Sequence, residues 1–198
     1  DISITPDAQA SGFTAKAAIT LTVHEATSSI TLNATDLKFS SAVLTPAAGA
    51  ARPLPATVSV DGPAQSATFS FAQPLARGRY TLALEYSGVI GTQAVGLFSL
   101  DYDTPDGKRR ALYTQFENSD ARRMIPAWDE PAYKATFSLQ AVVPAGQSAV
   151  SNMPFWRMSM SAARLVHSVR ESSGRAARMR PASPSRYRFC AVVLMCAN

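Results

Sequence analysis

Apolar and polar side chains alternate through most of the first 150 residues. Between residues 13 and 23 the apolar positions are Phe13, Ala15, Ala17, Ile19, Leu21 and Val23. The same period of two returns in shorter runs at residues 30–34, 58–60, 67–71, 80–86 and 135–143. A period of two puts one set of side chains on one face of a β-strand, so each run predicts a strand with one buried face.

Glycine and proline residues separate these runs and predict the turns between strands. The sequence TPDGK at residues 104–108 predicts a hairpin turn between two alternating runs. Many short antiparallel strands at regular spacing are typical of two packed sheets, so we predict an all-β fold, an antiparallel β-sandwich. Only residues 119–124 predict a helical turn, with Ser119 as its N-cap and Pro126 just beyond its end.

The chain of 198 residues joins two different compositions near Pro154. Residues 1–154 carry a net charge of −2, whereas residues 155–198 carry +7, from eight arginines and a single acid. The second part also has no lysine, and it mixes serine and alanine with Gly and Pro breaks. We predict a β domain over 1–154 and an irregular, Arg/Ser-rich tail over 155–198, aberrant or disordered. A coding sequence read out of frame explains this composition, and a genuine segment is the alternative.

We expect neither a membrane span nor a signal peptide in this sequence. No run of 18 apolar residues occurs, so we expect no membrane span. The first ten residues lack the basic start and apolar stretch of a signal peptide, so the sequence does not indicate a compartment. Ile2 and Ile4 already follow the strand pattern, which suggests that the chain starts inside a longer polypeptide or is a processed form.

Two arrangements of possible metal ligands are poor matches to known sites. His24 begins a sequence like the zinc motif H-E-x-x-H, but Ser28 stands where the second histidine is needed. Cys190 and Cys196 have a spacing unlike that of zinc fingers, and His167 adds only a third ligand. We therefore predict no metal site and no cofactor in this chain.

The arginines of the tail raise the question of nucleic acid. Clustered positive charge attracts a phosphate backbone. However, the tail offers few aromatic side chains for stacking, and no recognition module surrounds Trp156, Tyr187 and Phe189. We expect no specific nucleic-acid binding, and a binder that acts through its basic tail stays an alternative.

The segment between residues 112 and 139 is dense in polar groups. Gln115 and Glu117 lie two apart on a predicted strand, so they share one face, while Phe116 turns into the core. A carboxylate beside an amide suits a ligand that carries an ammonium group. Alternatively, Glu117 pairs with Arg122 or Arg123 and braces the turn. Periodicity alone favours this brace.

The same segment resembles a motif string of the aminopeptidase N family of zinc metallopeptidases, which includes the puromycin-sensitive and endoplasmic-reticulum aminopeptidases. The matching residues are Thr114-Gln115-Phe116-Glu117, Ala121-Arg122, Pro126, Asp129-Glu130-Pro131 and Lys134-Ala135-Thr136-Phe137. Fainter likenesses are ITLNATDL at residues 30–37, LEYSG at 84–88 and SNMP at 151–154. The resemblance covers about residues 1–154.

The resemblance implies roles for individual residues. Gln115 is expected to line the pocket for the first side chain of a peptide substrate, and Glu117 to bind its free α-amino group. The residues expected to hold the loop in place are Arg122, Asp129, Glu130 and Pro131. This chain departs from the family in ENSD after Phe116 and in Ala127, where relatives often have cysteine.

The family's catalytic motifs are absent from this sequence. The G-x-M-E-N loop, the H-E-x-x-H zinc helix, a downstream glutamate ligand and a tyrosine all follow the β domain in family members, and none of them occurs here. The resemblance therefore implies a truncated N-terminal domain with no catalytic residue, inactive alone, whose partners are the missing catalytic domain and peptide N-termini. Zinc belongs to the full-length family. A stand-alone, non-catalytic β-sandwich binding module is the main alternative.

Overall fold

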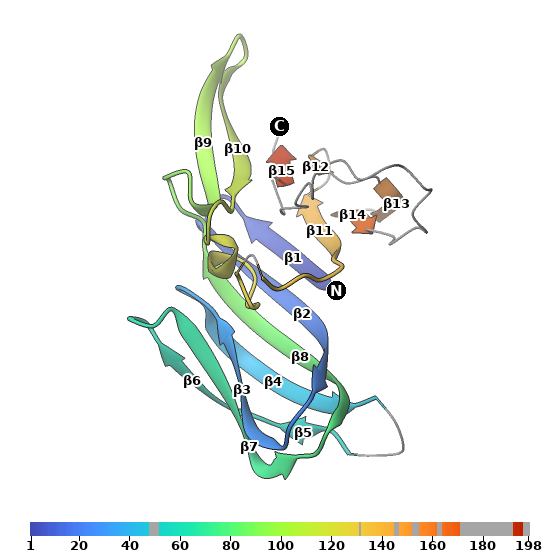
Figure 1. Ribbon diagram of the computed structural model, residues 1–198. Coiled ribbons are helices and arrows are strands. Elements are labelled where there is room, and N and C mark those ends of the chain that lie inside the picture. Colours follow the sequence, from blue (N-terminus) through green and yellow to red (C-terminus); the bar gives the residue numbers. More distant parts are fainter. Residues whose placement is uncertain are drawn as a thin grey trace, which may run out of the picture.

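The computed structural model describes residues 1–47, 52–130, 132–144 and 147–151, and the backbone of strands at 155–161, 164–170 and 192–195. Within these residues the fold is built from strands and a single 3-10 helix, η1 (Ala121–Arg123). Figure 1 shows the strands arranged as a large curved sheet, a smaller sheet beside it and a projecting hairpin. The prediction of an all-β fold is confirmed.

Three sheets form among the described strands. The largest has the order β13 (Phe155–Ser161), β14 (Arg164–Arg170), β11 (Ser138–Pro144), β1 (Ile2–Asp7), β2 (Gly12–Val23), β8 (Gly78–Val89), β4 (Lys38–Pro46) and β5 (Leu54–Pro55). The second has the order β12 (Ser148–Ser151), β15 (Val192–Met195), β10 (Gly107–Gln115) and β9 (Gly96–Thr104). The third has the order β3 (Thr27–Asn33), β7 (Ser66–Leu75) and β6 (Thr57–Asp61).

The pairing is antiparallel at every described ladder except that between β1 and β11. The longest ladder joins β2 to β8, and it runs without a break from the pair Gly12–Val89 to the pair Val23–Gly78. This ladder forms the centre of the large sheet, since β1 continues it on one side and β4 on the other. The parallel partner of β1 is β11, the first strand after the loop that follows β10.

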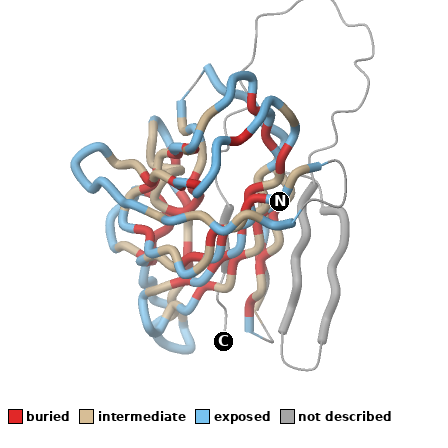
Figure 2. Tube along the Cα trace, turned by 90° about the horizontal axis from the view of Figure 1, so that it is seen from below, coloured by how far each residue is buried: buried red, intermediate tan, exposed pale blue. Residues whose placement is uncertain are grey.

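The main core lies between the large sheet and the three-stranded sheet. Figure 2 shows the buried residues gathered along the facing strands, with exposed residues in the turns. Leu82 of β8, Leu44 of β4 and Phe69 of β7 are fully buried. Phe39 links the two sheets, because its ring meets Phe69 edge-on at a centroid distance of 5.3 Å. Two facing apolar surfaces of this kind exclude water and hold the sheets together.

The predicted alternation is confirmed in most strands. In β2 the side chains of Phe13, Ala15, Ala17, Leu21 and Val23 are buried and that of Ile19 is half-buried, and the predicted apolar positions of β7 (residues 67–71) and β8 (residues 80–86) are buried as well. Two differences have local causes. Val60 is 50% exposed because β6 is the outer strand of its sheet. The strand predicted from residue 135 begins at Ser138, since residues 135–137 still belong to the preceding loop.

The predicted hairpin turn is confirmed, with β9 ending at Thr104 and β10 beginning at Gly107. Gly107 has φ +116°, a conformation that L side chains rarely adopt. The predicted helical turn is present as η1, but its predicted cap is wrong. Asp120 occupies the N-cap position without a side-chain cap, and Ser119 donates to Asn118 Oδ1 instead (3.3 Å).

Three described strands lie beyond residue 154, in the segment for which composition predicts an irregular tail. β13 and β14 extend the large sheet from β11, and β15 lies between β10 and β12. A strand ladder uses backbone groups, which every residue except proline supplies in full, so a poor hydrophobic pattern does not prevent it. The rest of this segment lies outside the described residues, and the division of the chain at residue 154 stays a prediction.

Helices of the kind that cross a bilayer, long and apolar, do not occur in the described part of the chain.

Candidate functional site

The polar segment begins where β10 ends. Gln115, the last residue of β10, pairs in register with Gly96 of β9, and its side chain is exposed. Phe116 is buried, with 5% of its surface exposed, and Glu117 is exposed again. The structure thus confirms that Phe116 packs into the core and that Gln115 and Glu117 lie outside it. The peptide bond after Glu117 is cis.

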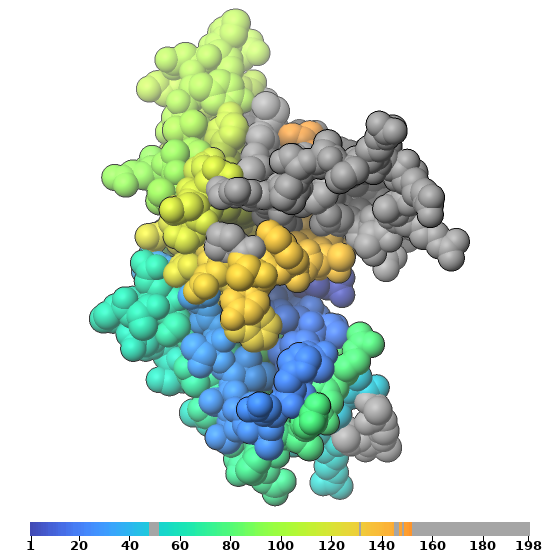
Figure 3. Space-filling model, viewed as in Figure 1, coloured from blue at the N-terminus to red at the C-terminus, as the bar shows by residue number. Residues whose placement is uncertain are grey.

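The loop from residue 117 to residue 130 crosses the surface of the molecule. In Figure 3 the yellow and orange segment that contains it lies between the projecting hairpin and the blue strands of the lower body. The exposed side chains of the loop therefore lie on this surface of the molecule. The same loop has a buried underside, because Met124 is fully buried and Ile125 is 4% exposed.

Arg122 and Asp129 close the second half of this loop. The carboxylate Oδ2 of Asp129 accepts hydrogen bonds from the backbone N–H and from Nε of Arg122, both at 3.1 Å. Nη2 of Arg122 donates to the carbonyl of Asp129 (2.9 Å), and Nη1 donates to Oε1 of Gln65 (3.2 Å). Only 13% and 14% of the two ionic side chains are exposed, so little water competes for the pair.

Arg123 makes a second pair of ionic contacts. Its Nε donates to Oδ1 of Asp120 (2.9 Å) and its Nη1 to Oδ2 of Asp36 (3.0 Å). Asp36 follows β3 in the chain, so the contact ties the loop to the three-stranded sheet. The brace interpretation of Glu117 needs a buried carboxylate beside Arg122 or Arg123. Glu117 is exposed, and both guanidinium groups are directed at aspartates.

Asn33, at the end of β3, forms hydrogen bonds with the far end of the loop. Its backbone N–H donates to the carbonyl of Ala127 (2.8 Å), and its carbonyl accepts from Ala127 N–H (3.2 Å). Its side-chain oxygen accepts from the backbone N–H of Asp129 (3.0 Å). The neighbouring Thr35 N–H donates to the carbonyl of Arg122 (3.0 Å). The loop is thus bound to the end of β3 and the residues after it through Arg122, near its middle, and through Ala127 and Asp129, near its end.

Tyr86 of β8 holds the middle of the loop from below. Its hydroxyl donates to the carbonyl of Met124 at 3.0 Å, in a buried position. Burial raises the pKa of the Tyr86 hydroxyl, because the phenolate would lose its hydration. The group therefore stays a hydrogen-bond donor at any ordinary pH, and the carbonyl of Met124 keeps its partner.

The remaining predicted residues lie at the loop's end. Glu130 is exposed, and its carbonyl accepts from the backbone N–H of Tyr133 (3.1 Å). Pro131 lies outside the described residues. Trp128 and Tyr133 are both exposed, and their rings approach to a centroid distance of 6.3 Å. Glu130 thus takes part in a turn through its backbone, while its carboxylate faces solvent.

Sequence reasoning missed the distant residues that contact this loop. Asn33, Asp36 and Gln65 all contact the loop, although they precede it by more than fifty residues. Asn33 and Asp36 fall within residues 30–37, one of the fainter likenesses to the aminopeptidase N family. That likeness was the available signal for a contact between the two segments.

Residues 1–166 match the family model described as the Peptidase M1 N-terminal domain. The chain belongs to the M1 peptidase family. The match confirms the resemblance found in the sequence, and it reaches beyond residue 154, through β13 and into β14. The family to which this domain belongs is a family of hydrolases, the M1 metallopeptidases.

Curated relatives show the same kinship. Aminopeptidase N of Acetobacter pasteurianus is 40% identical over 154 residues, 77% of this chain and 42% of the relative. Aminopeptidase M1 of Arabidopsis thaliana is 34% identical over 175 residues, 87% of this chain and 20% of the relative. Endoplasmic reticulum aminopeptidase 1 of Rattus norvegicus is 34% identical over 145 residues, 72% of this chain and 16% of the relative. The chain therefore spans less than half the length of each.

Zinc is the metal of the M1 family, and the described residues of this domain do not fit it. Among them no group of three or more His, Cys, Asp or Glu side chains is placed to hold a metal ion. His24 is exposed in the connection between β2 and β3. His167 lies on β14, of whose side chains nothing is described, and Cys190 and Cys196 lie outside the described residues.

Proposed function

We propose that this chain supplies the N-terminal β domain of an M1 zinc aminopeptidase, an enzyme that removes N-terminal residues from peptides. In this proposal Gln115 lines the pocket for the first side chain of the substrate, and Glu117 binds its free α-amino group. The observation that carries it is the exposed position of both side chains on either side of buried Phe116, at the end of β10.

The chemistry of the pair suits a peptide N-terminus. A carboxylate forms strong, charge-assisted hydrogen bonds with an ammonium group. An internal peptide bond presents a neutral N–H instead, so a carboxylate at this place selects chain ends over chain interiors. The neighbouring amide of Gln115 both donates and accepts, which allows it to contact side chains of different kinds.

The anchoring of the loop supports the same role. Arg122 is bonded to Asp129 and Gln65, Arg123 is bonded to Asp36, and Met124 is bonded to Tyr86. These contacts hold η1 and the residue after it in place, so the turn that follows Glu117 is anchored to the rest of the fold. A site held in one conformation before its ligand arrives loses less entropy on binding.

Metal chemistry is not assigned to the described residues of this chain. We propose that zinc and the groups that activate water belong to another part of the complete enzyme, and that this chain alone lacks peptidase activity. A stand-alone binding module, the alternative from the sequence, would use Gln115 and Glu117 to bind peptide N-termini without hydrolysis. The two functions differ in whether a catalytic domain is needed. The first requires one for hydrolysis, and the second does not.

A chimaera tests the proposal directly. Residues 1–151 of this chain would replace the matching segment of Aminopeptidase N of Acetobacter pasteurianus, to which the chain is 40% identical over 154 residues. Hydrolysis of an amino-acid anilide with a free amine is then measured. We expect activity in the chimaera, a fall in kcat/KM of at least about tenfold in Glu117→Gln, and a change in preference among first residues in Gln115→Ala.

The control is Glu25→Gln, which removes the same charge from an exposed residue between β2 and β3. It should leave kcat/KM unchanged. Equal activity in Glu117→Gln and Glu25→Gln would exclude α-amine recognition by Glu117. An inactive chimaera, combined with binding of free but not acetylated peptides by the chain alone, would favour the stand-alone module.

A further inference from the structure

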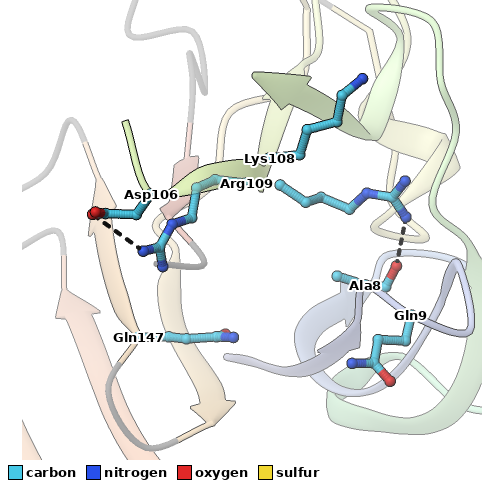
Figure 4. A pocket seen from close by; sticks show the side chains of 7 residues that line it. Ala8, Gln9, Asp106, Lys108, Arg109 and Gln147 are labelled. Carbon is cyan, nitrogen blue, oxygen red and sulfur yellow. Dashed lines mark hydrogen bonds and ion pairs between the residues drawn. The ribbon is translucent and has the colours of Figure 1, made fainter. Parts of the chain in front are cut away.

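A hollow of about 500 Å³ lies between the tip of the β9–β10 hairpin and the turn that joins β1 to β2. Its lining residues include Ala8, Gln9, Asp106, Arg109, Arg110 and Gln147. Lys108 lines it too, but its side chain extends away from Gln147, as Figure 4 shows. Cationic side chains outnumber the single carboxylate in this hollow, which makes it a basic site.

Two of the lining residues have polar atoms without a partner. Among the described residues, the buried side-chain atoms that make no hydrogen bond are Thr35 Oγ1, Arg109 Nη1 and Gln147 Oε1. The last two both belong to this hollow. Figure 4 shows the guanidinium of Arg109 above the side chain of Gln147, with Ala8 and Gln9 across the space. Buried polar atoms without partners are costly, so a ligand that pairs with both would be stabilised.

Arg110 does not provide the free charge. Its Nε and Nη2 donate to the two carboxylate oxygens of Asp101, at 2.6 and 2.8 Å. Its Nη1 donates to the carbonyl of Ala8 at 3.1 Å. Arg110 therefore fixes the hairpin to the β1–β2 turn and forms a wall of the hollow, with its own charge neutralised.

Compared with that of Arg110, the positive charge of Arg109 is neutralised much less. Its nearest carboxylate is Asp106, where Nη2 and Oδ2 are 3.9 Å apart, too far for a hydrogen bond. The side chain of Asp106 is 82% exposed, so solvent screens this contact, whereas that of Arg109 is only 22% exposed. The guanidinium of this lining residue thus has spare hydrogen-bonding capacity and spare charge.

We infer that this hollow binds a small oxyanion, a phosphate or a carboxylate, held by the guanidinium of Arg109 and the side-chain amide of Gln147. The planar guanidinium matches the spacing of two oxygens on either group. Oε1 of Gln147 needs a donor, which hydrogen phosphate supplies as O–H and the end of a peptide chain supplies as the N–H beside its carboxylate. The backbone N–H of Gln147 donates to the carbonyl of Pro144 at 3.2 Å, which holds Gln147 at the end of β11.

An NMR titration of the whole chain tests the site with two probes, inorganic phosphate and N-acetylglycine, at constant ionic strength. We expect the Nε–H signal of Arg109 to shift with at least one probe. Arg109→Gln should raise the Kd of that probe by at least about tenfold, since a charge-assisted pair is lost. Arg79→Gln, which removes the same charge from an exposed residue at the start of β8, should leave the Kd unchanged.

The outcomes separate the sources of the anion. Binding of phosphate alone assigns the hollow to phosphate groups, and binding of N-acetylglycine alone assigns it to chain ends. Should Arg109→Gln unfold, Arg109→Lys keeps the charge without the planar fork and should still weaken binding. The inference is overturned if neither probe shifts Arg109, if Arg109 variants bind as the parent does, or if Arg79→Gln weakens binding equally.

Discussion

Nε of Arg122 lies 3.1 Å from Oδ2 of Asp129, and this pair closes the second half of the loop between residues 117 and 130. The pair is mostly shielded from water, and Arg122 also contacts Gln65, which precedes it by 57 residues. One ion pair therefore joins a local turn to a distant part of the fold.

The first prediction concerns the free energy that this pair contributes. Asp129→Ala should lower the free energy of unfolding by about 3 kcal/mol, because it leaves the guanidinium of Arg122 shielded from water without its carboxylate. Chemical denaturation measures the change. The matched control is Glu85→Ala, which breaks an exposed pair with Lys16 and should cost less than about 1 kcal/mol. Similar losses in both variants would mean that the loop pair has no special role.

A second prediction concerns the contact between Gly96 and Arg123. Gly96 has φ +63°, and a Cβ atom added to it would lie 2.7 Å from the Cβ of Arg123. Gly96→Ala should therefore destabilise the fold by about 2 kcal/mol or more, through backbone strain and the clash together. Gly62→Ala is the control, since nothing lies within 4 Å of the added atom. Thermal unfolding should show a clear loss for the first variant and a change within about 0.5 kcal/mol for the second.

A third prediction addresses the hydrogen bond from Tyr86 to Met124. Tyr86→Phe keeps the buried ring and removes the hydroxyl, which leaves the carbonyl of Met124 without this donor. The expected loss is about 1 to 2 kcal/mol of unfolding free energy. Amide hydrogen exchange in residues 121–125 should also become faster, because the loop loses its anchor. Tyr102→Phe, at a side chain that is 40% exposed, should change neither quantity.

A fourth prediction is a pH dependence at the hairpin. The guanidinium of Arg110, through a hydrogen bond and its charge, holds the pKa of the Asp101 carboxyl below its ordinary value of 3.8. Because the folded pKa is depressed, the pair is intact above 3.8 and is lost as the pH falls through the lower, folded value. NMR titration of the Asp101 carboxyl carbon should give a midpoint below 3.8, which Arg110→Leu should raise. An unchanged midpoint in that variant would contradict the assignment.

The fifth prediction separates a binding role of Glu117 from a structural one. Glu117 is exposed, so Glu117→Gln in this chain should change the free energy of unfolding by no more than about 0.5 kcal/mol. A buried brace would lose several kcal/mol on the same change, since its arginine would lose the carboxylate. Urea denaturation of the parent and the variant decides between the two, and a large loss would remove Glu117 from the proposed substrate site.

The sequence by itself determined which face of most strands is buried. Alternation at Phe13 to Val23 and at Tyr80 to Tyr86 is a local property, and it predicted both strands and, apart from half-buried Ile19, their buried residues. The turn chemistry of residues 104–108 located the hairpin in the same way. Phe116 was also placed correctly, because side chains alternate along a strand, and the side chain between polar Gln115 and Glu117 therefore lies on the opposite, buried face.

Tertiary structure alone decided which groups the loop residues contact. Sequence offered Glu117 as a partner for Arg122 and Arg123, but the folded chain brings Asp129 and Gln65 to the first and Asp120 and Asp36 to the second. Asp36 is 87 residues from its arginine along the chain. Periodicity reports the side of a strand on which a residue lies, whereas its partners depend on which distant strand returns beside it. That return is set by the packing of whole sheets.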